Sequence, residues 1–390
     1  MNGKRILFLS NGHGEDQAAA EIIRHLLQLD PHLHITAMPI VGEGLAYREL
    51  NTEFIDAGAR LPSGGFMRLG PRNLISDLKA GLMAYTFRQI SLLKRQREQT
   101  DLVVACGDVF LLVMAGLFVK KPVVFYAAAK SEYINGHYTV EKFLMHKLAI
   151  KVFTRDEPTA RALADSGINA VYLGNPVMAE VKEAAGLGIK NNGDSILGFL
   201  PGTRDDAYEN ISDFLRTIEI LDMAEKKDAL KFIISFSAFL KPDILRKMLQ
   251  SRGVWNLGAA DNGYYVLKKA SINVFLIAGH FEAVLRESDL IIGLSGTGNE
   301  QAAGHGKPVV AFPVDRRQYN RRFAAAQKKL LGECLAVVEP DPSAAAKKVL
   351  EILGSDCIYR QMAAAGMERM GVKGGAGEIS KDILLILTGL

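Results

Sequence analysis

The sequence has few cysteines, little net charge and a single tryptophan. Its three cysteines, at positions 106, 334 and 357, lack the CxxC or CxxH spacing typical of zinc sites. They indicate neither a metal site nor a disulfide framework, and they favour a reduced cytoplasm. The formal net charge of +4 is too small and too dispersed to indicate nucleic-acid binding.

Long apolar runs are also lacking. No run reaches the roughly 18 residues that spanning a membrane requires. The N-terminal apolar run reaches a polar loop too soon for the apolar region of a signal peptide. Hydrophobic residues nevertheless make up 48% of the chain and charged residues 23%, which indicates a folded globular protein. A chain of 390 residues suits two domains of roughly 150 to 200 residues each.

The chain alternates short apolar runs with turns and with stretches of helical spacing. The expected strands lie at 5–10, 33–41, 54–57, 101–105, 122–127, 150–154 and 170–173, and then at 196–200, 231–236, 273–277 and 309–313, with a further strand from Leu290. This alternation predicts an α/β fold of two doubly wound, Rossmann-like domains. We expect a first domain at 1–176, a linker at 177–194, a second domain at 195–356, and C-terminal helices at 357–390 that pack back towards the first domain. The stretch 253–269 reads as a hairpin or a loop.

The stretch 290–313, LIIGLSGTGNEQAAGHGKPVVAFP, combines an apolar strand, a glycine-rich loop, a helix beginning near Asn299 and another strand. Glycines allow the loop backbone to approach a ligand, and the helix N-terminus offers free N–H groups. Glu300 falls in the first turn of that helix. Such a site suits a nucleotide diphosphate with a ribose.

A second strand and turn precede a helix at the start of the second domain. There Gly202 allows backbone approach, Thr203 offers a hydroxyl, and Arg204 offers a planar fork for phosphate. An arginine in a turn can also be simply solvated. The repeated context of strand, turn and helix favours phosphate contact.

The N-terminal loop NGHGED carries Gly12 and Gly14 but lacks the third glycine of a dinucleotide fingerprint. Its polar residues His13, Glu15 and Asp16 either cap the following helix or lie in a substrate cleft at the carboxyl edge of the sheet.

Asp108, which follows the strand at 101–105, also has two candidate roles. It is an N-cap, or it is a general base that takes a proton from an acceptor hydroxyl.

The segment 60–97 has eight basic residues and one acidic residue, with apolar residues between them. This mixture is typical of a surface that docks on an anionic membrane. It also fits a domain helix with an ordinary basic outer face.

Several of these motifs resemble one enzyme group. LSGTGNEQAAGHGKPVVAFP followed by RRQYN resembles the donor site of the GT-B glycosyltransferases, in which two doubly wound domains face a cleft. It is most similar to lipid A disaccharide synthase and to the peptidoglycan N-acetylglucosaminyltransferase of the lipid II step. PGTR resembles the synthase's PGSR, and GNPV and CGDVF resemble its junction and acidic motifs. With GHGED, the full chain fits the lipid-A-disaccharide-synthase-related proteins.

The resemblance implies roles by position. Glu300 would bind the ribose of UDP, and the diphosphate would lie against the loop of Ser295, Gly296, Thr297, Gly298 and Asn299. Gly202, Thr203 and Arg204 would lie near the phosphates, and Gln318 and Asn320 would reach the donor sugar. Asp108 would be the general base, with His13 and Asp16 as further catalytic candidates. Gly12, Gly14 and Glu15 would bind substrate. The synthase's GEASGD signature is replaced here by NGHGED, so its acyl-sugar substrates do not carry over.

The expected function is transfer of a sugar from a UDP-sugar to a lipid or lipid-linked acceptor, with no metal and no other cofactor. The expected place is the inner face of a bacterial cytoplasmic membrane, as a peripheral protein. Two alternatives remain open. UDP-N-acetylglucosamine 2-epimerases share the architecture and the donor site, and a non-catalytic lipid or nucleotide binder would need no base.

Overall fold

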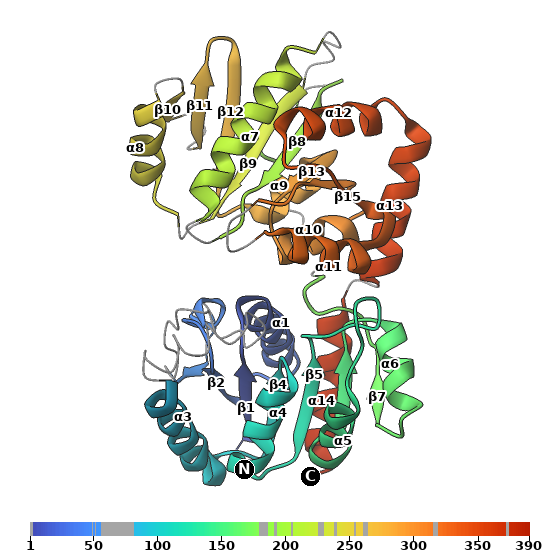
Figure 1. The fold of residues 1–390 in the computed structure, drawn as a ribbon. Helices are drawn as coiled ribbons and strands as arrows, with labels where there is room; N and C mark the ends of the chain where they lie inside the picture. The colour runs from blue at the N-terminus through green and yellow to red at the C-terminus, as the bar shows by residue number, and fades with distance from the viewer. Residues whose placement is uncertain are drawn as a thin grey trace. The chain divides into compact units, whose positions relative to one another are not determined.

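The computed structural model describes residues 3–48, 50, 52–55, 82–178, 186–190, 193–203, 206–224, 230–237, 240–252, 255–259, 264–314, 319–371 and 374–390. The chain forms two compact units (Figure 1). Unit 1 comprises Met1–Ala179 and Val372–Leu390, and unit 2 comprises Glu180–Gly371. Each is an α/β unit around one sheet.

The described strands of unit 1 form a parallel sheet of order β3-β2-β1-β4-β5-β6-β7. They are β1 (Arg5–Ser10), β2 (His34–Pro39), β3 (Glu53–Phe54), β4 (Leu102–Cys106), β5 (Val123–Ala127), β6 (Lys151–Thr154) and β7 (Ala170–Val171). The strand order reverses between β1 and β4. Ligands of doubly wound sheets bind at such a reversal, outside the carboxyl ends of the strands.

Helices connect these strands and cover the sheet. They are α1 (His13–Leu29), α3 (Leu82–Gln96), α4 (Val109–Met114), α5 (Thr139–Leu148), α6 (Glu157–Ala164) and α14 (Gly375–Thr388), with the short 3-10 helices η1 (Leu45–Tyr47) and η3 (Arg97–Gln99) and the π-helix η4 (Ala115–Val119). Both faces of β1 are buried, because Ile6 and Phe8 join one core cluster while Leu7 and Leu9 join another. A fully buried parallel strand reads as a continuous apolar run, as this one does.

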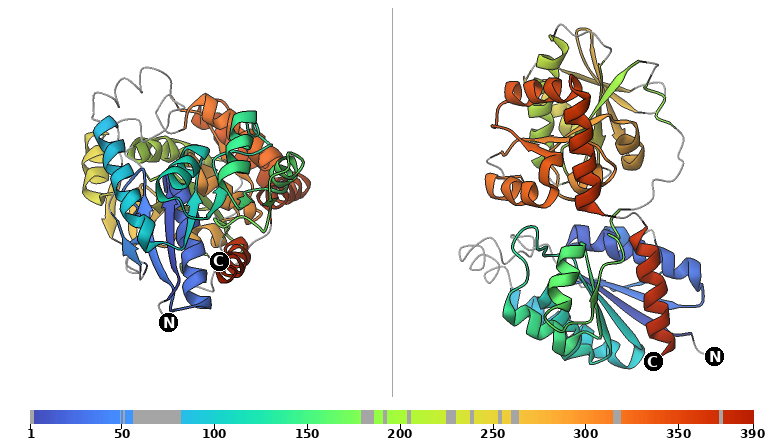
Figure 2. Two further views of the ribbon diagram at one scale, coloured as in Figure 1. Left: turned by 90° about the horizontal axis from the view of Figure 1, so that it is seen from below. Right: turned by 90° about the vertical axis from the view of Figure 1, so that its right-hand side faces the viewer.

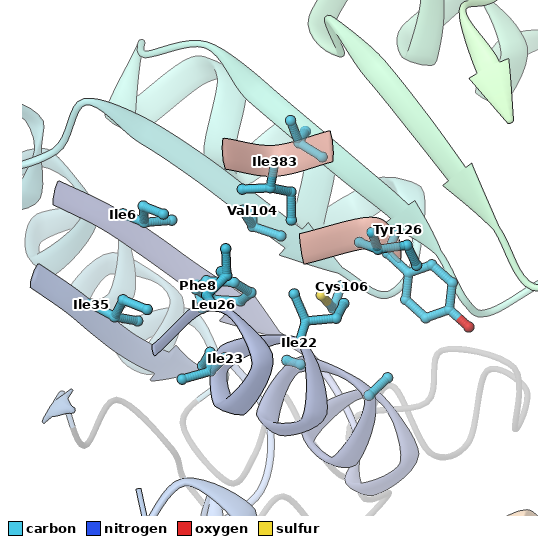
Figure 3. Close-up of a cluster of buried hydrophobic side chains, with 14 of the residues drawn as sticks. Ile6, Phe8, Ile22, Ile23, Leu26, Ile35, Val104, Cys106, Tyr126 and Ile383 are labelled. Atoms are coloured by element: carbon cyan, nitrogen blue, oxygen red, sulfur yellow. The ribbon is translucent and has the colours of Figure 1, made fainter. Parts of the chain in front are cut away.

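The first of these clusters lies between the sheet, α1 and α14. Figure 3 shows Ile22 and Leu26 of α1 and Ile383 of α14 beside Phe8 and Val104 of the sheet. The Ser380 hydroxyl of α14 also donates to the Ile22 carbonyl of α1 at 3.0 Å. The last helix therefore belongs to the core of unit 1 (Figure 2).

The described strands of unit 2 form a sheet of order β10-β11-β12-β9-β8-β13-β14-β15. They are β8 (Ser195–Leu200), β9 (Leu230–Phe236), β10 (Asn256–Ala259), β11 (Tyr265–Lys269), β12 (Ile272–Ala278), β13 (Leu290–Gly293), β14 (Val309–Ala311) and β15 (Leu335–Val337). β10, β11 and β12 pair antiparallel, so the described part of the stretch 253–269 contains the two paired strands of the expected hairpin, and the other pairs are parallel. The order reverses between β8 and β13.

The helices of unit 2 are α7 (Asp206–Asp222), α8 (Pro242–Arg252), α9 (Phe281–Glu287), α10 (Thr297–Gly304), α11 (Arg321–Leu331), α12 (Pro342–Leu353) and α13 (Asp356–Met370), with the turn η5 (Gly332–Cys334). The helix expected near Asn299 begins two residues earlier, at Thr297. β15 was not among the strands expected from the sequence.

The boundaries of the units differ from the expected ones in two places. The segment 357–390 is divided, because α13 packs on α10 within unit 2 while α14 packs on α1 within unit 1. The expected linker at 177–194 is also partly packed. Leu187 and Ile189 are buried, and the Leu187 N–H donates to the Glu287 carboxylate at 2.6 Å.

Candidate functional site

Two of the predicted nucleotide-binding turns follow neighbouring strands of unit 2. β8 leads into Pro201, Gly202 and Thr203, and β13 leads into the loop Leu294–Gly296 and then α10. The Leu294 N–H donates to the Leu200 carbonyl at 2.9 Å, so the two strand ends are joined directly. Gly202 has a φ of +92°, a backbone conformation that favours glycine. The reversal of strand order therefore brings residues 201–203 of the PGTR motif beside the LSGTGNE motif.

The loop before α10 packs tightly against the buried side chain of Asn299. A Cβ on Gly293 would lie 1.8 Å from the Asn299 side-chain oxygen, so only glycine fits there. The Asn299 side chain is fully buried and donates to the Gly293 carbonyl at 3.0 Å. Asn299 was expected to contact substrate; the structure instead turns its amide inward, where it supports the loop.

Gln327 of α11 completes this support, and sequence reasoning missed it. Its Nε2 donates to the carbonyls of Ser295, at 3.2 Å, and Gly296, at 3.0 Å. Its Oε1 accepts from the Asn299 amide at 2.9 Å and from the Tyr319 hydroxyl at 2.8 Å. We call Gln327, Asn299 and Tyr319 the Gln327 network. Burial raises the pKa of Tyr319 above its usual value of 10.0, so this hydroxyl stays a donor.

The residues that remain at the surface of the loop are half-buried: Ser295, Gly296, Thr297 and Glu300. The Ser295 hydroxyl accepts from the Gly298 N–H at 3.3 Å, which shapes the entry to α10. Glu300 lies in the first turn of α10, as expected. An anion at this helix end would meet N–H groups, and Glu300 would lie beside it.

The segment after β14 was expected to contact the donor sugar through Gln318 and Asn320. Asn320 caps α11, because its side-chain oxygen accepts from the Phe323 N–H at 3.0 Å. That bond accounts for its place in the fold, and contact with a donor sugar stays a prediction. Gln318 and Arg204 lie outside the described residues.

In unit 1, the loops after β1 and β4 meet at the reversal of strand order. A Cβ on Gly107 would lie 2.0 Å from the Asn11 side-chain oxygen, which shows how closely the two loops approach. α1 begins at His13, with Glu15 and Asp16 in its first turn and Gly12 as its N-cap residue. A Cβ at position 12 would lie 2.3 Å from the Glu15 carboxylate, so the two residues are in close contact. Of His13 the structure describes only the backbone.

Asp16 does not reach the surface of this loop. It is only 2% exposed, and its carboxylate accepts from the Ser10 hydroxyl, which in turn accepts from Tyr47, each at 2.6 Å. Burial raises the pKa of Asp16 from 3.8 to about 7, the Ser10 hydrogen bond opposes this, and the charge of Glu15 adds to it. Asp16 was expected among the catalytic residues; its burial excludes direct contact with a substrate in this conformation.

Asp108 is the N-cap of α4, and its carboxylate accepts from the Leu111 N–H at 3.2 Å. The capping role expected from the sequence is therefore present. Asp108 is half-buried and follows β4 at the carboxyl edge of the sheet. A cap uses one carboxylate oxygen, so the role of general base stays a prediction that capping does not contradict.

The loops after β5 and β6 hold a further polar group that sequence reasoning did not single out. Lys130 pairs with Glu141 at 2.6 Å, and Asp156 caps α6 through the Thr159 N–H at 2.9 Å. Burial lowers the pKa of His137 from 6.5 to about 4, so its imidazole is neutral at neutral pH. The Ala129 N–H donates to the Gly107 carbonyl at 3.4 Å, which places this loop beside that of Asp108.

The described residues contain no cluster of three or more histidine, cysteine, aspartate or glutamate side chains suited to a metal ion. No described helix has both the length and the apolar character needed to cross a membrane.

Comparison with known proteins identifies the fold. No family model and no curated protein matches the chain. Among solved structures, the UDP-GlcNAc 2-epimerase of Neisseria meningitidis bound to UDP-GlcNAc is 17% identical, with 99% of this chain and 100% of that chain covered and a TM-score of 0.57. The calicheamicin glycosyltransferase CalG4 is 15% identical, with 100% of this chain and 99% of that chain covered and a TM-score of 0.60. MurG of Acinetobacter baumannii is 14% identical, with 98% of this chain and 99% of that chain covered and a TM-score of 0.56.

These likenesses confirm the fold class expected from the sequence. The chain has the two-domain α/β architecture of the GT-B type, with doubly wound, mainly parallel sheets. Glycosyltransferases and UDP-GlcNAc 2-epimerases both have this fold, so the fold by itself does not choose between them.

Proposed function

We propose that this protein is a glycosyltransferase that moves a sugar from a UDP-sugar to a hydroxyl of a lipid or lipid-linked acceptor. The observation that carries the proposal is the junction of β13 and α10, where a tightly packed loop opens a helix with Glu300 in its first turn. Amides at a helix N-terminus suit a diphosphate, and a nearby carboxylate suits ribose hydroxyls. The UDP-GlcNAc bound to the epimerase of the same fold supports this choice of ligand.

In the proposed mechanism, unit 2 binds the donor and unit 1 binds the acceptor. The bond between the sugar and UDP breaks, and UDP leaves as an anion whose charge the loop amides and the α10 N-terminus stabilise. Thr203 and Arg204 add donors after β8. Asp108 takes the proton of the acceptor hydroxyl as the new glycosidic bond forms. This chemistry requires no metal ion, and because Asp16 is buried, His13 is the other candidate for the base.

The proposed place of action is an anionic membrane surface, and unit 1 offers a second reason for it. The neighbouring elements α4, η4 and α5 expose large apolar side chains: Phe110 is 47% exposed, Leu117 51%, Val140 62% and Phe143 58%. We call these four residues the apolar face. Lys120 and Lys147 are exposed on or beside the same elements. Apolar side chains among cations are what a bilayer of anionic lipids attracts.

The segment 60–97, which first suggested a membrane, is only partly described. Its residues 60–81 lie outside the described part, and the rest contains α3, which packs on η4 and exposes Phe87 and Arg88. The exposed part of α3 thus extends the basic and apolar character of the α4, η4 and α5 region.

A UDP-sugar 2-epimerase is the second candidate, because solved structures of such enzymes share the fold over the full chain. An isomerase needs carboxylates and a histidine around the sugar, and the burial of Asp16 removes that carboxylate as a candidate in both mechanisms. An isomerase has no use for an apolar membrane face, and this favours transfer.

The nucleotide assignment is tested by calorimetry of UDP binding to Glu300→Ala. Loss of a charged hydrogen-bonding group should weaken UDP binding roughly tenfold or more. Glu282→Ala is the matched control, because Glu282 occupies the first turn of α9 in the same unit and is exposed. Equal UDP affinities for Glu300→Ala and the wild type would remove Glu300 from the site.

The reaction class is tested by incubating the protein with UDP-GlcNAc that carries a label in its sugar, together with extracted bacterial membrane lipids. Transfer releases UDP and moves label into the lipid fraction, whereas epimerisation changes the nucleotide sugar without lipid label. Binding without either product would support the non-catalytic alternative.

A further inference from the structure

The side chain of Gln327 is almost completely buried, yet its amide is fully used by polar partners. An amide of this kind can make two donor and two acceptor bonds, and Gln327 makes all four within unit 2. Both donor bonds go to backbone carbonyls of the loop before α10. A buried amide is costly unless it is paired, so this arrangement fixes the loop in one conformation.

The direction of those two bonds sets the direction of two N–H groups. A trans peptide unit is planar, with its C=O and N–H on opposite sides. The carbonyl of Ser295 shares a peptide unit with the N–H of Gly296, and the carbonyl of Gly296 shares one with the N–H of Thr297. Because Gln327 draws both carbonyls towards the core, the N–H groups of Gly296 and Thr297 point away from it.

We propose that Gln327 is a positioning residue of the nucleotide site, which aims the N–H groups of Gly296 and Thr297 at the diphosphate of bound UDP. The inference rests on the proposed function, since it takes UDP to be the ligand of this loop. It adds a residue that is distant in sequence and does not itself touch the nucleotide.

The same network reaches the other parts of the site. The Gly296 carbonyl accepts both from Gln327 and from the N–H of Glu300, at 3.3 Å, so it also sets the first turn of α10. On the other side, Tyr319 donates to Gln327 while its carbonyl accepts from the Val314 N–H at 2.8 Å. The start of α10 and the base of the segment after β14 are therefore held by one side chain.

The test is calorimetry of UDP and of uridine with the full chain carrying Gln327→Glu. At pH 8 the ionised carboxylate faces two carbonyl oxygens and repels them, so UDP affinity should fall roughly tenfold relative to the wild type. Uridine lacks the diphosphate, and its affinity should change less than about twofold. Burial raises the pKa of this carboxyl above its usual value of about 4.3, so at pH 5.5 it gains protons and restores one donor, and the ratio of variant to wild-type UDP affinity should recover.

Three comparisons make the result decisive. Gln250→Glu adds the same charge to exposed Gln250 of α8 and should bind UDP like the wild type. Tyr319→Phe removes one bond to Gln327 and should weaken UDP binding a few-fold while sparing uridine, which keeps the test open if Gln327→Glu fails to fold. Thermal unfolding at both pH values checks that each variant is folded.

The outcomes separate this inference from the proposed function. If the wild type binds UDP and both network variants bind it equally well, the positioning role is overturned and the nucleotide site stands. Equal losses of UDP and uridine affinity would show a merely structural role and would also overturn it. If the wild type binds no UDP, the proposed function itself fails, and the inference fails with it.

Discussion

Asp16 is a buried acid whose protonation depends on the fold. Its pKa is raised from 3.8 to about 7, chiefly by burial, against the hydrogen bond from Ser10 and with a smaller contribution from Glu15. Because the pKa in the folded protein exceeds that in the unfolded chain, the folded state binds the proton more tightly. Its contribution to stability is full below about pH 4 and is lost as the pH rises to about 7.

We therefore expect Asp16→Asn to stabilise unit 1 at pH 8 and to have little effect at pH 4. Asparagine keeps an oxygen that accepts from Ser10, and it carries no charge to desolvate. The interval from 3.8 to about 7 corresponds to at most about 4 kcal/mol of unfolding free energy. Urea unfolding at a series of pH values measures the difference, with exposed Asp165→Asn as the control. Parallel pH profiles for the two variants would refute the assignment.

Residue types alone predicted which loops carry the polar groups, but not which way the groups point. Glu300 and Asp108 lie at helix starts at the carboxyl edges of their sheets, as their positions after apolar strands indicated. Asp16 and Asn299 have the same polar character but face inward. Their partners decide this: Tyr47 reaches Asp16 through Ser10, and Gln327 meets Asn299. Those pairs are distant in sequence, so no local pattern reveals them.

At the level of elements, strands and helices were predictable because apolar periodicity is a local property. The packing partner of a helix is not a local property and could not be predicted in this way. α13 and α14 are adjacent in sequence, yet α13 packs on α10 and α14 on α1. Each helix also has a glycine in close contact with its own unit. A Cβ on Gly366 of α13 would lie 2.4 Å from the Ala303 carbonyl, and one on Gly375 of α14 would lie 2.3 Å from the Gly174 backbone.

Gly366→Ala should consequently push α13 away from α10. We expect about 1–3 kcal/mol of lost stability in unit 2, since overpacking forces the backbone to move. UDP affinity should fall as well, because α10 carries Glu300. Urea unfolding and calorimetry measure the two effects. Gly258→Ala is the control, because a Cβ there meets nothing within 4 Å. Wild-type behaviour of Gly366→Ala would contradict the close packing of these helices.

For the whole molecule, the membrane proposal depends on the apolar face of unit 1. We expect the wild type to float with vesicles of phosphatidylglycerol and phosphatidylcholine, and less so with phosphatidylcholine alone. The double substitution Phe110→Ser with Phe143→Ser should lower binding roughly tenfold or more, since each phenyl ring buried in lipid contributes more than about 1 kcal/mol.

Met223→Ser provides the comparison for flotation. Met223 is 80% exposed and lies in unit 2, so its loss should leave flotation unchanged. High salt should weaken binding of the wild type by screening the lysines. A wild type that stays out of the vesicle fraction at low salt would rule out the membrane proposal.

The placement of α14 in unit 1 has a consequence for the order in which the two units are made. Unit 2 is one continuous stretch, Glu180–Gly371, so a ribosome delivers all of it without interruption. Unit 1 needs α14, whose Ile379 and Ile383 fill its core, and that helix is synthesised only after unit 2. Domains fold as units as they emerge during synthesis. The half of the molecule that is begun first is therefore the half that is finished last.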